Sequence, residues 1–286
     1  YPDIEKDFSD RLLTMPIAED GSVNFAVGAS LLGVKPVVNL ITGDFAYRAF
    51  DSIANTCAKL NFVLPDGEPP RTIVIQAEFL TAGPTTGQRV EMLFARIPGL
   101  NVVLPSTPKD AYGLMRTALE TPGVTVFFED RMIPDSQIAT VEQLSPFPEE
   151  NRPIPFGKAR ACTHPVTPSL TVVAYALMRE LVEGLVWEHD LLDRVELLDL
   201  RTLYPLDMDF IAASVEVTGQ ILVVEPDIWF GGIGAEIIAQ LHELLGGAFN
   251  AKRLGAPRLT ISARPDEREL YLPSREEILE AIRGLV

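Results

Sequence analysis

The chain has 286 residues, of which 47% are hydrophobic, and its formal net charge is −16 at pH 7. This length suits two α/β domains of ordinary size, and the negative charge makes the phosphate backbone of a nucleic acid a poor partner. The richest apolar run, Leu170 to Met178, is too short to span a membrane, so we expect no membrane insertion.

The cysteine content points to a reducing compartment. Cys57 and Cys162 lie far apart and offer neither a disulfide framework nor the spacing of metal ligands. No signal peptide is recognisable at the start of the chain, which favours a cytoplasmic protein. Because the chain begins at Tyr1 rather than at a methionine, we also expect that part of the natural N-terminus is missing.

In the first half, apolar runs of strand length alternate with segments of helical period, the pattern of a parallel sheet flanked by helices. A proline-initiated helix with Thr107 as N-cap is predicted at Pro108–Glu120. Residues 1–135 are therefore expected to form one α/β domain. Its predicted strands are Val37–Ile41, Thr72–Ala77, Asn101–Leu104 and Thr125–Phe128, and its other predicted helices are Phe45–Phe62 and Gln88–Arg96.

The second half repeats this alternation after an interruption. Between Met132 and Pro168 the periodicity fails and prolines accumulate, which indicates an extended linker at 136–168. Residues 169–286 then form a second α/β domain, so the fold class is α/β, with two tandem domains that each contain a mostly parallel sheet flanked by helices. The predicted strands are Leu170–Tyr175, Val195–Leu198, Ile221–Val224 and Leu259–Ile261. The first predicted helix follows the strand Leu170–Tyr175 and ends at about His189, and the others are Asp207–Ser214, Gly234–Leu245 and Arg275–Leu285.

Several local motifs occur in a fixed order along nearly the whole chain. They are MPIAEDG at 15–21, AVGA at 26–29, DF at 44–45, AFDSIAN at 49–55, FARIPGL at 94–100, VVLPSTPKDA at 102–111, DLRTLYPLD at 199–207, GGIGAE at 231–236 and LPS at 272–274. In order and spacing they resemble the β subunit of the thiamine-diphosphate-dependent first component of 2-oxoacid dehydrogenase complexes, of the pyruvate and branched-chain type.

This resemblance implies the identity of both domains. Residues 1–135 correspond to a transketolase-like pyrimidine-binding domain, and 169–286 to a transketolase C-terminal domain. A member of the family carries a further strand and helix before the segment that aligns with Tyr1. We therefore expect the first domain to lack that opening strand and helix.

The resemblance also implies a cofactor shared between subunits. This chain holds the aminopyrimidine of thiamine diphosphate, while an α-type partner carries the diphosphate and Mg²⁺, in an α2β2 assembly. Glu19 matches the glutamate that hydrogen-bonds a ring nitrogen and favours the imino tautomer, which leads to the ylid. A partly buried carboxyl group suits this task because it can keep a proton and share it with the ring. On the residues alone, Glu19 is equally explained as a helix-dipole charge on a helix that starts near Gly21.

Three apolar residues match the surround of the pyrimidine ring: Ile17, Ile41 and Phe45. Phe45 can supply stacking area for a flat ring, whereas Ile17 and Ile41 could equally be ordinary core residues. The pair Gly43-Asp44 is interpreted as a strand-end turn and helix N-cap rather than a metal site, and no metal ligand is assigned to this chain.

The segment at 83–89 departs from the family. Thr86 occupies the position of a family histidine, and Arg96 replaces a second one; threonine can donate a hydrogen bond but does not shuttle protons near neutral pH. The substrate-side candidates are therefore Thr86, Gln88 and Arg89. The two arginines could pair with an anionic substrate or simply be solvated.

The second domain offers no recognisable catalytic set. The turn before Gly234 could expose backbone N–H groups at a helix start, but Glu236 there is interpreted as structural. The three histidines, His164, His189 and His242, are expected at the surface.

Three functions are compatible with these residues. The first is a β-type subunit of a 2-oxoacid dehydrogenase-like enzyme, which is active only with its α-type partner, forms the ylid and transfers an acyl or ketol unit from a 2-oxoacid or ketone donor, with a lipoyl transacylase as a further partner. The second is a subunit of a two-component transketolase-like carboligase, favoured by the missing histidines. The third is a non-catalytic partner of the same fold, against which Glu19 and Phe45 argue.

Overall fold

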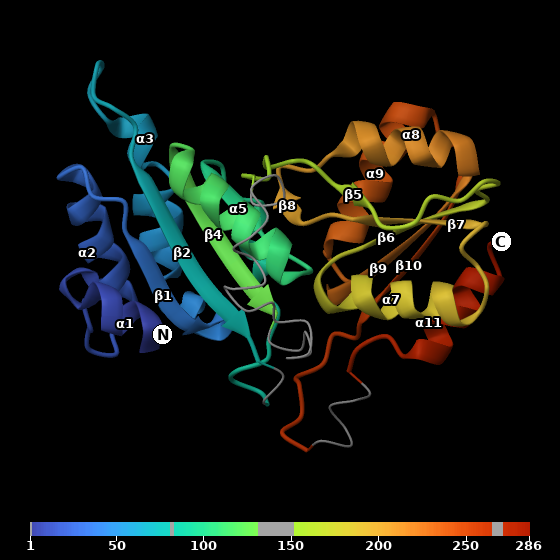
Figure 1. Ribbon diagram of the computed structural model, residues 1–286, viewed down its shortest axis with the longest axis horizontal. Coiled ribbons are helices and arrows are strands. Elements are labelled where there is room, and N and C mark those ends of the chain that lie inside the picture. The colour runs from blue at the N-terminus through green and yellow to red at the C-terminus, as the bar shows by residue number, and fades with distance from the viewer. Residues whose placement is uncertain (1, 81–82, 131–151, 265–270) are drawn as a thin grey trace.

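The computed structural model describes residues 2–80, 83–130, 152–264 and 271–286. Their strands form two five-stranded, mostly parallel sheets, each flanked by helices (Figure 1). The predicted fold class is confirmed. Among these residues, no helix has both the length and the apolar character that crossing a membrane requires.

The first sheet has the strand order β1-β2-β4-β3-β8. The strands β1 (Val37–Thr42), β2 (Thr72–Phe79), β4 (Gly123–Asp130) and β3 (Leu100–Val103) are parallel, and all four were predicted within a few residues. The edge strand β8 (Thr202–Tyr204) is antiparallel to β3 and comes from the C-terminal half of the chain. The two halves are therefore joined through a shared sheet, which the sequence did not predict.

The second sheet has the strand order β10-β9-β6-β7-β5. Its predicted strands correspond to β6 (Leu170–Ala174), β7 (Val195–Asp199) and β9 (Gln220–Ile228). The predicted strand at Leu259–Ile261 is wrong, because the edge strand is β10 (Asn250–Ala256), which is largely exposed and lacks an apolar run.

Part of the predicted linker has regular structure. The short strand β5 (Arg160–Ala161) is antiparallel to β7. Just before it, Ile154 and Phe156 pack against buried residues of the first half, and the N–H of Ile154 donates to the carbonyl of Gly113 at 3.0 Å. Positions 136–151 of the predicted linker lie outside the described residues.

The helices of the first half follow the predicted order with different lengths. Helix α5 (Pro108–Glu120) matches the prediction, and the side chain of Thr107 caps it by accepting from the Asp110 N–H at 3.1 Å. The single helix predicted at 45–62 is wrong: the segment is divided into the 3-10 helix η2 (Gly43–Tyr47), the π-helix η3 (Ser52–Cys57) and α3 (Leu60–Val63). The remaining helical segments are α1 (Pro2–Phe8), η1 (Ser9–Arg11), α2 (Glu19–Leu31) and α4 (Glu91–Ala95).

Among the described residues, helices lie on both faces of the second sheet (Figure 1). Helices α7 (Ala176–Glu188) and α11 (Arg275–Arg283) pack together on one face, and α8 (Met208–Thr218) and α9 (Ile233–Leu245) on the other. Each corresponds to a predicted helix, and α11 begins with a capping box between Ser274 and Glu277.

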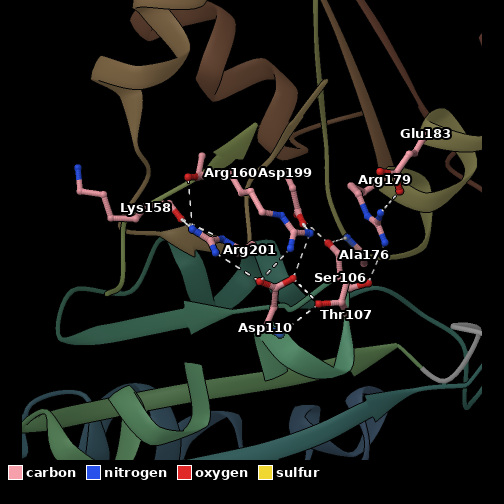
Figure 2. A network of polar contacts seen from close by, with 11 residues as sticks. Ser106, Thr107, Asp110, Lys158, Arg160, Ala176, Arg179, Glu183, Asp199 and Arg201 are labelled. Carbon is pink, nitrogen blue, oxygen red and sulfur yellow. Dashed lines mark hydrogen bonds and ion pairs between the residues drawn. The ribbon is translucent and has the colours of Figure 1, made fainter. Parts of the chain in front are cut away.

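A buried polar network joins the two halves (Figure 2). Ser106, after β3, donates to Asp199 Oδ1 at 2.7 Å and accepts from the N–H of Ala176 at 2.8 Å. Arg160 Nη2 lies 3.0 Å from Asp199 Oδ2 and 3.2 Å from Asp110 Oδ2. Burial, followed by the nearby Asp110 charge, raises the pKa of Asp199 to about 6. These contacts fix the second sheet relative to α5 and so position the loops that connect the two halves.

Candidate active site

Glu19 is the first residue of α2, and its side chain is half-buried. Helix α2 packs against β1, and only residues 32–36 connect the two. A short helix-to-strand connection places the end of the helix beside the start of the strand, so the helix start lies at the carboxyl end of β1. Glu19 therefore lies at the sheet edge where ligands of open α/β sheets bind.

Polar contacts hold the first turn of α2 in place. The Ser52 hydroxyl, at the start of η3, donates to the Asp20 carboxylate, and Asn24 Nδ2 donates to Ser52 Oγ at 2.6 Å. Because Glu19 directly precedes Asp20, these bonds also limit the movement of its backbone. Two acidic residues begin the helix, which is also favourable for the helix dipole.

Ile41 has an unusual backbone for a β-branched residue. Its φ is 67°, at an irregularity in the pairing of β1 with β2, and its N–H donates to Asn39 Oδ1 at 2.7 Å. This conformation is costly for isoleucine and is concentrated at functional sites in proteins. Ile41 lies on the exposed face of β1, with its side chain 60% exposed, and the side chain of Ile17, in the segment before α2, is 94% exposed. The interpretation of these two residues as ordinary core residues is wrong.

Phe45 is half-buried in η2, directly after β1. The neighbouring turn at the end of β1 was predicted, but the N-cap role of Asp44 is wrong. The structure places Thr42 at the N-cap position without a capping side-chain bond, whereas Asp44 Oδ2 accepts from the Gln88 N–H at 3.2 Å. Burial raises the pKa of Asp44 despite this hydrogen bond.

The segment 83–90 passes close to this region. Thr86 and Gln88 are half-buried, and the Thr86 N–H lies 3.4 Å from the Gly83 carbonyl oxygen. A methyl group added at Gly87 would come within 2.9 Å of the Leu80 carbonyl oxygen, which explains the glycine. The substrate-side candidates Thr86 and Gln88 therefore lie on a tight loop whose backbone is linked to the turn that carries Phe45.

Arg89 is buried, so its interpretation as a solvated arginine is wrong. Its Nη2 lies 2.5 Å from Asp130 Oδ2, and its Nη1 lies 4.0 Å from Glu91 Oε1. The guanidinium also stacks over the Phe79 ring, 4.3 Å from the centroid. The charge of Arg89, which was considered as a partner for an anionic substrate, is therefore directed at partners inside the protein. Of the two arginines considered for that role, Arg96 is the exposed one.

Sequence reasoning missed a cluster of buried carboxylates beside Arg89. Burial, followed by the charge of Asp227, raises the pKa of Glu91 to about 8, and burial raises that of Glu225 to about 7 and that of Asp227 to about 6. The Tyr175 hydroxyl lies 3.4 Å from Glu91 Oε1. Acidic residues at the end of the apolar run of β9 were the available signal, but their neighbours come from distant parts of the chain.

The second half contributes no further predicted site residue. His164, His189 and His242 are exposed, as predicted, and Glu236 is exposed and accepts from Gln240. The N–H of Gly234 is not free for a ligand, because it donates to Glu225 Oε2 at 3.2 Å. Within the described ranges, no group of three or more His, Cys, Asp and Glu side chains is arranged to hold a metal ion.

Glu19, Ile41 and Phe45 lie at the carboxyl end of β1 or directly beyond it, and Ile17 lies just before α2; we refer to these residues as the open half-site. A carboxyl group at the start of α2 can exchange a hydrogen bond with a ring nitrogen, while Ile17, Ile41 and Phe45 offer apolar area for a flat ring. The exposure of both isoleucines leaves this surface uncovered by the described chain.

Comparisons with known proteins identify both halves. The protein-family model described as "Transketolase, pyrimidine binding domain" matches residues 3–134, and the family model described as "Transketolase, C-terminal domain" matches residues 161–278. A solved chain described as a split-gene transketolase, inactive β4 tetramer, superposes with a TM-score of 0.78 at 19% identity and covers 99% of this chain and 86% of its own. It shares the fold.

Two curated relatives show a closer relation. The pyruvate dehydrogenase E1 component subunit beta of Rickettsia felis is 31% identical over 285 residues, which cover 96% of this chain and 82% of the relative. The acetoin:2,6-dichlorophenolindophenol oxidoreductase subunit beta of Cupriavidus necator is 33% identical over 281 residues, with 96% and 80% coverage. The chain therefore belongs to the family of β subunits of the thiamine-diphosphate-dependent E1 components of 2-oxoacid dehydrogenases, as its motifs predicted.

Proposed function

We propose that this chain contributes the pyrimidine-binding half of a thiamine-diphosphate enzyme that acts on a 2-oxoacid or ketone donor. It acts with an α-type subunit that holds the diphosphate and Mg²⁺, in a cytoplasmic α2β2 assembly. The relatives named above are β subunits, which supports a partner chain.

The observation that carries the proposal is the open half-site around Glu19. The helix start is fixed through Asp20 and Ser52, and next to it β1 ends in the strained, outward-facing Ile41. Exposing large apolar side chains to water is unfavourable in free energy, and this free energy is regained when a ligand or a partner covers them. Strain at Ile41 is explained if its side chain has to meet a ring rather than the core.

The residues fit the aminopyrimidine in chemistry. The Glu19 carboxyl group can form a hydrogen bond with a ring nitrogen, while Phe45 and Ile41 exclude water from the ring. When bound, thiamine diphosphate supplies a carbon nucleophile for the donor carbonyl group. The role of this chain is to orient the ring and to keep the Glu19 carboxyl group beside a ring nitrogen.

The residues expected to face the acceptor substrate support a second candidate function, a carbon–carbon transferase. Thr86 lies half-buried on the loop next to the site, and the three histidines of the chain are exposed elsewhere. A threonine hydroxyl can orient a carbonyl group but cannot carry a proton to or from an intermediate near neutral pH. Carboligation to an aldehyde or ketone acceptor therefore fits this loop at least as well as transfer to a lipoyl transacylase.

Calorimetric titration of thiamine diphosphate and Mg²⁺ into the complex with the α-type subunit tests the proposal. We expect Glu19→Gln to keep cofactor affinity within about tenfold, since the amide can still form one hydrogen bond, and to lower 2-oxoacid turnover by about 10²–10⁴. Glu236→Gln, an exposed residue of the second half, serves as the matched control.

Either of two results would contradict this assignment. Wild-type turnover by Glu19→Gln would remove the carboxyl group from the mechanism. Failure of the wild-type complex to bind the cofactor or turn over any donor would favour a non-catalytic partner of the same fold.

A further inference from the structure

The loop 83–90 meets, at both of its ends, residues that the proposed function does not use. At one end, Gly83 has a φ of 127°, and a methyl group added there would be in van der Waals contact with Ala263 of the second half. At the other end, Arg89 is anchored among Phe79, Asp130 and Glu91. The central residues Thr86 and Gln88 lie between these two points.

A direct contact ties this loop to the turn that carries Phe45. The Gln88 N–H donates to Asp44 Oδ2 at 3.2 Å, across 44 positions of sequence. The carboxylate is half-buried, and burial raises its pKa, so accepting this backbone bond offsets part of the cost of its position. Movement of the loop would break this bond.

A second contact runs through the Phe79 ring. The Arg89 guanidinium lies over one face of the ring, and Gly43 lies so close to the ring that a methyl group there would come within 2.5 Å of Phe79 Cε1. Phe79 itself is 2% exposed and stacks on Phe128 at 4.9 Å between centroids. The loop and the η2 turn therefore share one rigid support in the core.

Burying the charged guanidinium of Arg89 is unfavourable in free energy, which indicates that Arg89 does more than fill space in the core. Replacing a buried ion pair by apolar residues is often neutral or stabilising, so stability alone does not require a guanidinium here. A planar cation that is hydrogen-bonded to the Asp130 carboxylate and stacked over the Phe79 ring specifies one register of the loop more strictly than an apolar side chain does.

We propose that Asp44 and Arg89 are positioning residues, which hold Thr86 and Gln88 at a fixed register against Phe45 and so set the substrate side of the pocket next to the cofactor ring. This inference rests on the proposed function. In this proposal the loop 83–90 determines which donor and acceptor substrates bind. Glu19 and the apolar residues of the half-site bind the cofactor.

Hydrogen exchange on the isolated full chain tests the positioning itself. We expect Asp44→Ala to increase the exchange rate of the Gln88 amide at least about tenfold, because the acceptor of its hydrogen bond is gone. Asp44→Asn keeps an acceptor oxygen and should restore slow exchange. Asp66→Ala, at an exposed position before β2, is the control for loss of a carboxylate.

Kinetics of the assembled enzyme separates positioning from general destabilisation. Asp44→Ala should raise the KM for a 2-oxoacid about tenfold while the Kd of thiamine diphosphate changes less than about threefold, and Asp44→Asn should recover the wild-type KM. A fall in active-site concentration at unchanged KM would overturn the inference, as would unchanged exchange at Gln88. Absence of cofactor binding by the wild-type complex would overturn the proposed function itself, which is a different result.

Discussion

Glu91 gives the folded chain a pH-dependent stability that can be measured directly. The carboxyl group is fully buried, and burial, followed by the charge of Asp227, raises its pKa from 4.5 to about 8 against the opposing effect of Arg89. The folded state therefore binds this proton more tightly than the unfolded state. Its stabilising contribution is complete below about pH 4.5 and is lost as the pH rises to about 8.

The magnitude follows from proton linkage. One proton held in the folded state changes the free energy of unfolding by about 1.4 kcal/mol per pH unit, so Glu91 alone accounts for a loss of about 3 kcal/mol between about pH 5.5 and about pH 8. Glu91→Gln has nearly the same shape, does not titrate, and keeps an oxygen for the Val90 N–H that now donates at 3.0 Å. We expect the variant to resemble the wild type at the lower pH and to be more stable at the higher pH.

Urea denaturation of both chains at several pH values provides the assay, with the exposed Glu236→Gln as the control. The difference in free energy of unfolding between Glu91→Gln and the wild type should grow with pH. A constant difference over the whole range would show that Glu91 does not hold its proton in the folded state and would refute the reasoning.

Two further substitutions test the packing between elements. Gly99→Ala should destabilise the fold by about 4 kcal/mol or more in thermal denaturation, because a methyl group there would lie 1.9 Å from the Ala58 carbonyl oxygen at a φ of 96°. Gly67→Ala is the control: its φ is 87° but the space around it is open, so it should cost only about 1–2 kcal/mol. Equal losses of stability in the two variants would contradict the steric argument. Ser106→Ala should lower the free energy of unfolding by about 2 kcal/mol in urea and raise the pKa of Asp199 further, since the hydroxyl now donates to that buried carboxylate at 2.7 Å. A loss below about 0.5 kcal/mol would show that this hydrogen bond of the network in Figure 2 does not stabilise the junction between the two halves.

Local sequence patterns were sufficient for most of the elements and for the family. The central strands of both sheets appear as short apolar runs, and α5 and α11 carry capping residues that mark their starts. The motif around Glu19, with the spacing of the later motifs, indicated the family before any contact was known. These features depend on neighbours in sequence, which is why periodicity and caps could reveal them.

Contacts between distant residues decided the rest. The strands β5 and β8 have two and three residues and exist only because β7 and β3 supply their partners. The burial of Arg89 depends on Asp130, 41 positions away, and the positive φ of Ile41 occurs where the pairing of β1 with β2 is irregular. A single sequence carries no direct record of such pairs, because the free energy of burying a charge or straining a backbone is set by which other segments the fold brings beside it.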